Sequence, residues 1–235
     1  MTWLFNQAAV LRHEGHMEQA IEKYRRALEI SPSYAAAHDG LGLVLKTQGK
    51  TREALGHFRQ ALELDPNSAE THNNLGVALA SLGKLDEAIG HFRRSLQLDA
   101  DHAYAQMSLG TALRARGELK QAVSHFRRAL EINPGLAAAA NNLAWILATA
   151  DDPGLRNGAE AVELASNAAR LTDHEDAAVL DTLAVAYASE GRFAEAIRTA
   201  NQALELLGRD ATPLAREIRA RLQTFRAAKP YRPHP

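Results

Sequence analysis

A period of 34 residues is the feature of this sequence that most constrains its fold. Four columns keep this interval: Ala20, Ala54, Ala88 and Ala122; Tyr24, Phe58, Phe92 and Phe126; Gly15, Gly49, Gly83 and Gly117; Leu28, Leu62, Leu96 and Leu130. Fixed periods of about 20–50 residues indicate arrays of small units, because each unit must stack on its neighbours to bury its apolar face. We therefore expect a repeat protein rather than a single closed core.

Within one period the pattern indicates two helices joined by a tight turn. Gly49 stands where a first helix would end, and glycine suits the left-handed conformation of a helix C-cap. Ala54 and Phe58 then belong to a stripe with three- and four-residue spacing, which is typical of an amphipathic helix. Pro66 follows, where it stops this helix and permits the next one to begin. The repeated unit is therefore a helical hairpin.

Small residues recur where the two helices of a hairpin would meet. Gly42, Gly76 and Gly110 form one such column inside the first helix. A glycine within a helix costs about 0.5–1 kcal/mol relative to alanine. Three of them in one column indicate a steric requirement, and the aromatic column on the second helix supplies it.

We predict an all-α solenoid of six hairpins closed by a capping helix. The hairpins are expected at 1–34, 35–68, 69–102, 103–136, 137–176 and 177–210, the capping helix at 211–228 and a flexible tail at 229–235. Leu214, Ile218, Leu222 and Phe225 carry the capping prediction, since an array needs its last apolar face covered. An insertion at 149–158 replaces the glycine turn of the fifth hairpin, and both a tolerated surface loop and a contact loop explain it.

The N-terminal end has no capping helix before it. Trp3 and Leu4 lie in the first helix of the first hairpin, where an apolar face would stay open. We expect that the chain either belongs to a longer array or associates with itself through this end.

Composition excludes several classes of protein. The chain has 27 basic and 28 acidic residues, a net charge of -1, so nucleic acid and membranes are not expected partners. It has no cysteine, which excludes disulfides and thiolate chemistry. No apolar run approaches the roughly 20 residues that span a bilayer. A soluble protein is predicted, and although the compartment stays open, the cytoplasm is favoured over the periplasm.

Residues with catalytic or metal-binding potential are few. His57, His91 and His125 share the 34-residue period, but equivalent positions in stacked repeats lie about 8–10 Å apart, too far for one ion. The segment from Gly49 to Thr51 lacks the upstream glycine and strand of a phosphate-binding loop. We therefore predict no enzyme activity, no catalytic residue, no metal site and no cofactor.

The C-terminal stretch is the one strongly basic segment. Its seven basic residues outnumber Asp210 and Glu217, and they favour either the solvated side of the capping helix or an anionic contact. They are Arg209, Arg216, Arg219, Arg221, Arg226, Lys229 and Arg232.

The segment from His72 to Asp99, HNNLGVALASLGKLDEAIGHFRRSLQLD, resembles the tetratricopeptide repeat family. The family pattern is a Leu-Gly pair, a glycine turn, and then alanine, aromatic and alanine before a proline. The resemblance covers six repeats. It implies a right-handed superhelix in which the first helix of each repeat lines a concave groove.

Carrying the groove positions of the family onto this chain gives a set of candidate binding residues. Asparagine is suited to hold a peptide backbone because its amide both donates and accepts. The basic residues form a row that Asp39, Glu70 and Asp181 oppose, so a peptide of mixed or acidic character is expected. The candidates are Asn6, Asn73, Asn74, Asn141, Asn142, Arg12, Lys46, Arg114 and Trp145.

The sequence therefore predicts a protein-interaction scaffold that binds a peptide or a partner protein in its groove. One alternative is the repeat portion of a larger enzyme or membrane protein that presents substrate or mediates assembly. Another is a self-assembling scaffold that stacks through its N-terminal end.

Overall fold

The computed structural model describes residues 2–208 and 212–232, and this part of the chain contains thirteen α-helices and no strand. The prediction of an all-α repeat fold is confirmed. The helices are α1 (Thr2–His13), α2 (Met17–Ile30), α3 (Ala35–Thr47), α4 (Thr51–Leu64), α5 (Ala69–Ser81), α6 (Leu85–Leu98), α7 (Ala103–Ala115), α8 (Leu119–Ile132), α9 (Ala137–Thr149), α10 (Gly158–Leu171), α11 (Ala177–Ser189), α12 (Phe193–Leu207) and α13 (Pro213–Arg226).

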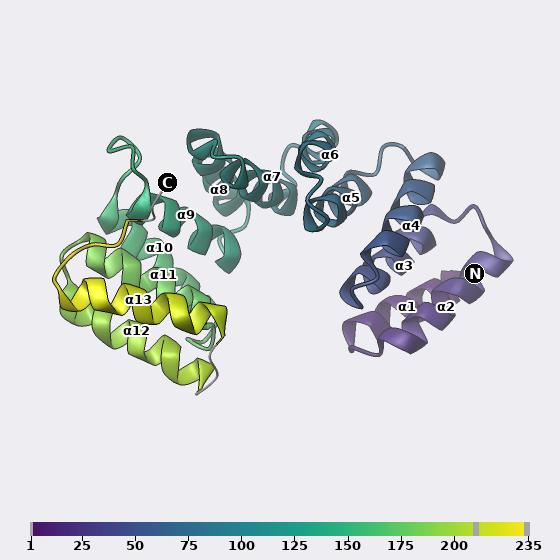
Figure 1. The fold of residues 1–235 in the computed structure, drawn as a ribbon. Coiled ribbons are helices and arrows are strands. Elements are labelled where there is room, and N and C mark those ends of the chain that lie inside the picture. The colour runs from purple at the N-terminus through teal and green to yellow at the C-terminus, as the bar shows by residue number, and fades with distance from the viewer. Residues whose placement is uncertain (1, 209–211, 233–235) are drawn as a thin grey trace. The chain divides into compact units, whose positions relative to one another are not determined.

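The chain forms two compact units, unit 1 at Met1–Arg116 and unit 2 at Gly117–Pro235 (Figure 1). Each of the six segments that the sequence marks as hairpins holds two helices. Among the described helices, none combines the length and the apolar character that crossing a bilayer requires.

A left-handed turn glycine closes every hairpin except the fifth, which carries the insertion. Gly49 has a φ of 78°, which glycine adopts without the steric cost that a side chain brings. The next residue, Lys50, donates its backbone N–H to the carbonyl of Leu45 at 2.9 Å. This bond satisfies a carbonyl at the end of α3 that has no partner within the helix.

Glycine and aromatic side chains set the distance between the two helices of a hairpin. A Cβ built on Gly42 would lie 2.6 Å from Cε1 of Phe58, and one on Gly76 would lie 2.6 Å from Cε1 of Phe92. Both rings are almost completely buried. The glycine column therefore exists because the aromatic ring occupies the space of a methyl group.

The insertion leaves the fifth hairpin intact. It occupies the loop between Thr149 and Gly158, and Asn157 donates its backbone N–H to the carbonyl of Leu147 at 3.0 Å. Leu147 occupies the same repeat position as Leu45, so the loop leaves the hairpin and then rejoins it through the same capping bond.

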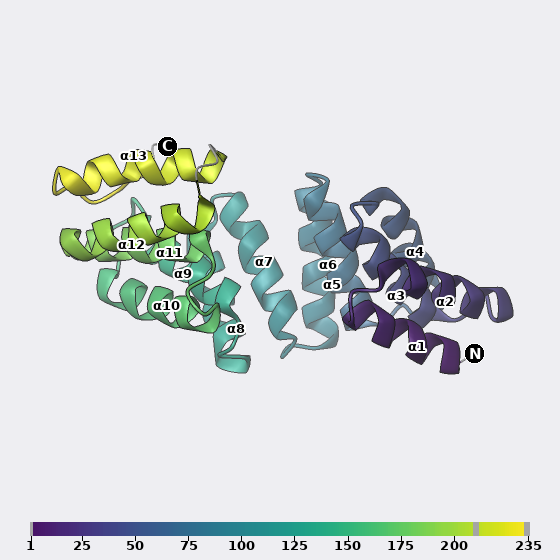
Figure 2. The ribbon, with the colours of Figure 1, turned by 90° about the horizontal axis from the view of Figure 1, so that it is seen from below.

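The capping helix α13 packs against α12 and α11 in unit 2, and Figure 2 shows it beside α12. Ile218, Leu222 and Phe225 are buried there. After α13, Tyr231 and Arg232 are partly buried and contact α9, and the flexible tail expected at 229–235 stays a prediction. Residues 209–211 and 233–235 lie outside the described part of the chain.

Candidate functional site

Unit 1 contains a charged cavity of about 260 Å³. Aromatic and aliphatic side chains, among them Phe5, Tyr24 and Leu43, form much of its wall. Arg12, Asp39 and Glu70 place charges on it, and Asp65 and Ser68 also line it. The residues from α1 and α3 come from repeat positions that the family uses to line its groove.

Asp39 and Asn74 connect neighbouring repeats at this cavity. The Asn74 amide donates from Nδ2 to both carboxylate oxygens of Asp39 at 3.2 Å. Burial raises the pKa of the Asp39 carboxyl, which the hydrogen bond from Asn74 partly offsets. Asp39 is therefore a half-desolvated carboxylate that a cationic ligand group would stabilise.

Glu70 and His102 extend the same row across the next repeat. His102 Nε2 lies 3.2 Å from Glu70 Oε2, and this contact raises the pKa of His102 while it lowers that of Glu70. Arg12 adds a positive charge that acts on both Asp39 and Glu70. With two carboxylates in the row and a further one at Asp65, the cavity favours a basic ligand group.

A second, apolar cavity of about 390 Å³ lies between α5, α6 and α7. Five of its lining residues, Val77, Ala80, Met107, Ser108 and Thr111, take repeat positions that also line the charged cavity, so the two cavities share one face of unit 1. The residues that line the apolar cavity are Val77, Ala80, Met107, Ser108, Thr111, Ala112 and Ala115 from α5 and α7, with Leu85 and Phe92 from α6.

Lys46 and Arg114 are both half-exposed, and burial lowers the pKa of each. Neither side chain makes an ion pair with another described residue. They share a repeat position with Ala80 of the apolar cavity, one repeat before it and one after it. They are therefore candidates to contact a carboxylate of a ligand that occupies this face.

The predicted asparagines lie in different surroundings. Asn6 is exposed, whereas Asn142 donates to the carbonyl of Ala138 within its own helix at 2.8 Å. Asn73 and Asn141 each have a buried Oδ1 with no hydrogen-bond partner in the described chain. Asn74 is the asparagine of this set that bridges two repeats at the cavity.

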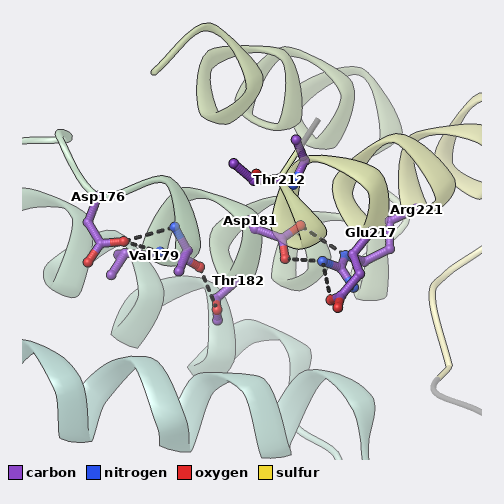
Figure 3. A network of polar contacts seen from close by, with 9 residues as sticks. Asp176, Val179, Asp181, Thr182, Thr212, Glu217 and Arg221 are labelled. Atoms are coloured by element: carbon purple, nitrogen blue, oxygen red, sulfur yellow. Dashed lines mark hydrogen bonds and ion pairs between the residues drawn. The ribbon is translucent and has the colours of Figure 1, made fainter. Parts of the chain in front are cut away.

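In unit 2, Trp145 lies against the C-terminal segment rather than in an open groove. Its ring centroid is 6.1 Å from that of Tyr231, and the guanidinium of Arg221 lies 5.5 Å from the Trp145 ring. Asp181 accepts from Arg221 at 3.0 and 2.6 Å, and both side chains are nearly inaccessible to solvent (Figure 3). Asp181 therefore does not oppose the basic row as the sequence suggested, since Arg221 neutralises it.

Two histidine pairs escaped the sequence analysis. His38 and His57 lie with their Nδ1 atoms 3.1 Å apart, and His72 and His91 repeat this at 3.0 Å. The sequence contained a signal for these pairs, because the two histidines of each pair are separated by the same 19 residues. His57 and His91 of the histidine column thus each contact a histidine on the preceding helix, which the expectation of a surface or packing role did not include.

No three histidine, aspartate or glutamate side chains in residues 2–208 and 212–232 lie close enough together to hold a metal ion. The predictions of no metal and no cofactor stay predictions. The basic C-terminal stretch is divided by the fold, since Arg221 is buried against Asp181 and Arg232 contacts the end of α9. Arg209 and Asp210 lie outside the described residues.

Family comparisons decide the class of the repeats. Models described as tetratricopeptide repeat match residues 1–67, 40–103, 103–136 and 177–206. The chain belongs to the tetratricopeptide repeat family. The hairpin that carries the insertion lies in the one stretch between these matches, as expected for a unit whose turn departs from the pattern. No curated protein matches the chain.

Solved structures of tetratricopeptide repeat proteins share the fold. Pseudomonas aeruginosa pilF is 24% identical with a TM-score of 0.79, over 93% of this chain and 96% of that one. PilW, a type IV pilus biogenesis factor, is 20% identical with a TM-score of 0.76, over 92% and 97%. YrrB, described as having an unusual peptide-binding site, is 22% identical with a TM-score of 0.50, over 92% and 90%. Tetratricopeptide arrays are typically non-catalytic, and the repeats support a protein-interaction scaffold.

Proposed function

We propose that unit 1 binds an extended segment of a partner protein along the face that carries the charged and the apolar cavity. The observation that supports this most is the juxtaposition of desolvated charge with open volume at Asp39. A charged group that loses hydration without a cation in direct contact raises the free energy of the unliganded protein. A ligand that supplies the counter-charge recovers that energy on binding.

The lining of the charged cavity favours a lysine or arginine side chain as the group that enters it. Such a side chain has an apolar stem that suits Phe5, Tyr24 and Leu43, and a cationic head that suits Asp39 and Glu70. An apolar ligand residue would occupy the cavity at Val77 and Met107 on the same face. YrrB shows that a protein of this fold carries a peptide-binding site.

Selection of displayed peptides on the full chain tests the proposal. Enriched peptides should contain a basic residue and an apolar residue, and their Kd should be measured by fluorescence anisotropy. Asp39→Asn keeps the shape of the side chain but removes its charge, so it should weaken these peptides about tenfold or more, since a hydrogen bond to a charged group contributes about 1.5–3 kcal/mol.

Glu63→Gln is the matched control, because it removes an exposed carboxylate from α4 that lines neither cavity. Its affinities should equal those of the wild type. Enriched peptides without basic residues, unchanged affinity in Asp39→Asn, or a selection that enriches nothing would each contradict the proposal.

A further inference from the structure

The C-terminal segment contacts α9 and α13 within unit 2. The Tyr231 ring lies 5.3 Å from the guanidinium carbon of Arg221, which also lies 5.5 Å from the Trp145 ring. Both rings thus lie within about 6 Å of one guanidinium, the range in which an aromatic ring attracts a cation. Trp145 comes from α9 and Arg221 from α13, while Tyr231 follows after the chain has turned back (Figure 1).

The guanidinium of Arg221 is held in place by residues outside the C-terminal segment. Asp181 holds the guanidinium in a two-point ion pair, and Glu217 Oε2 lies 3.4 Å from its Nη1 (Figure 3). A guanidinium held in this way keeps its flat face oriented. The occupant therefore has to supply only the second ring.

The next residue of the tail fills a second position. Arg232 donates from Nη1 to the carbonyl of Ala148 at 2.9 Å. This carbonyl belongs to the last turn of α9, where free carbonyls favour a positive charge. The neighbouring carbonyls of Ile146 and Leu147 already accept from Ala150 and Asn157, so Ala148 is the one that Arg232 completes. Asp151 of the insertion adds a favourable charge, and Arg156 an unfavourable one.

We propose that Trp145, Ala148 and Arg221 form a binding site for an aromatic residue followed by a basic residue, here called the tail seat. Tyr231 and Arg232 are its resident occupant, and a partner segment of the same chemistry displaces them. The tail reaches the seat only a few residues after α13 ends, so its effective concentration is high, in the millimolar range for short linkers. The resident tail therefore reduces the apparent affinity for a partner segment.

A labelled peptide with the sequence of residues 227–235, AAKPYRPHP, is the probe. It should bind the full chain carrying Tyr231→Ser and Arg232→Ser at least about tenfold more tightly than it binds the wild type, because the variant leaves the seat open. Adding Trp145→Leu to the variant should abolish this gain. Circular dichroism and thermal unfolding confirm that each variant is folded before its affinity is compared.

Tryptophan fluorescence gives a second readout that does not depend on the labelled probe. The chain has two tryptophans, so Trp3→Phe leaves Trp145 as the reporter. Its emission should change when the tail is substituted and return toward the wild-type spectrum when the unlabelled peptide is added. If the Trp145→Leu variant loses its fold, this readout alone decides the question.

Four results would overturn the proposal. The first is that the probe binds the wild type and the tail variant with equal affinity, and the second is that a scrambled peptide, in which Tyr and Arg are separated, binds as tightly as the probe. The third is a Trp145 emission spectrum that does not change when the tail is substituted. The fourth is a wild-type dimer, seen in light scattering, that dissociates when the tail is substituted. The last would show that the tail exchanges between two copies. Because Asp39→Asn alters unit 1 alone, it should leave probe binding unchanged, so this test and that of the unit 1 face can fail separately.

Discussion

At the scale of single residues, one aspartate position serves two different purposes. Asp39 and Asp181 stand at the same place in their repeats, and each accepts hydrogen bonds from the next helix but one along the chain, α5 for Asp39 and α13 for Asp181. The donor to Asp39 is the neutral amide of Asn74, whereas the donor to Asp181 is the guanidinium of Arg221. The first carboxylate is the one that we propose to meet a cationic ligand group, and the second pairs with the capping helix.

This difference predicts opposite effects on stability. Asp181→Ala leaves the buried Arg221 without its main partner, and breaking a buried pair costs about 3–5 kcal/mol. Asp39→Asn removes a desolvated charge and should stabilise the protein by up to about 1 kcal/mol, because sites built for binding often reduce stability. Urea unfolding measures both, and equal losses for the two variants would contradict this assignment.

The histidine pairs make stability depend on pH. His38 Nε2 lies 3.0 Å from the carbonyl of Pro32 and must donate to it, so its Nδ1 is left to accept from Nδ1 of His57. Burial, followed by the neighbouring histidine, lowers the pKa of His57, and the same holds for His91. At His57 and His91 the folded protein therefore binds protons less readily than the unfolded chain, in which histidines titrate at about 6.5.

Because these pKa values are lowered in the folded state, the histidines contribute stability above pH ~6.5 that is lost as the pH falls below it. The melting temperature should decrease between pH 7.5 and pH 5.5. Replacing His57 and His91 together with glutamine should reduce this decrease. A decrease of the same size in the double variant would show that other groups cause it.

At the scale of helices, the spacing within a hairpin depends on residues that carry no side chain. Gly76→Ala would force a methyl group against the buried ring of Phe92, and such overpacking typically costs about 1–3 kcal/mol. Gly90 lies in the second helix of the same hairpin, where an added Cβ meets no atom within 4 Å. Gly90→Ala should stabilise the protein by about 0.5–1 kcal/mol. Thermal unfolding of the two variants should give shifts of opposite sign.

The helices were predictable from the sequence because their signals are local and repeated. The glycine at the position of Gly49 and the aromatic residue at the position of Phe58 recur every 34 residues, and this repetition reveals the turn and the buried stripe. The tail seat was not predictable, since Trp145, Arg221 and Tyr231 occur once and are brought together by the direction that the chain takes after α13. The link from Asn74 to Asp39 was missed for a related reason. The family pattern describes positions that face a ligand, but it does not say which of them bond to each other.

At the scale of the whole molecule, each unit has one proposed binding surface that can be described by itself. Unit 1 offers the charged and the apolar cavity, and unit 2 offers the tail seat. The open apolar end predicted from Trp3 corresponds to a ring that is 66% exposed on α1, and Val10 on the same helix is 55% exposed. Self-association through this helix remains a proposal.

Replacing Trp3 and Val10 with serine tests that proposal. If α1 mediates association, light scattering should show the wild type growing in mass with concentration, while the double variant stays monomeric because the apolar area is removed. Leu206→Ser is the control, since this residue is also exposed but lies on α12. A wild type that stays monomeric at every concentration would remove self-association from consideration.

The bond between Asn157 and Leu147 has a practical consequence. Since the chain leaves and re-enters the hairpin at one fixed pair of backbone atoms, the length of what lies between them is uncoupled from the register of the helices that follow. A foreign epitope grafted in place of residues 151–156 should therefore be displayed beside Arg232 without shifting any downstream helix. The fifth hairpin is thus the natural place to attach a reporter to this scaffold.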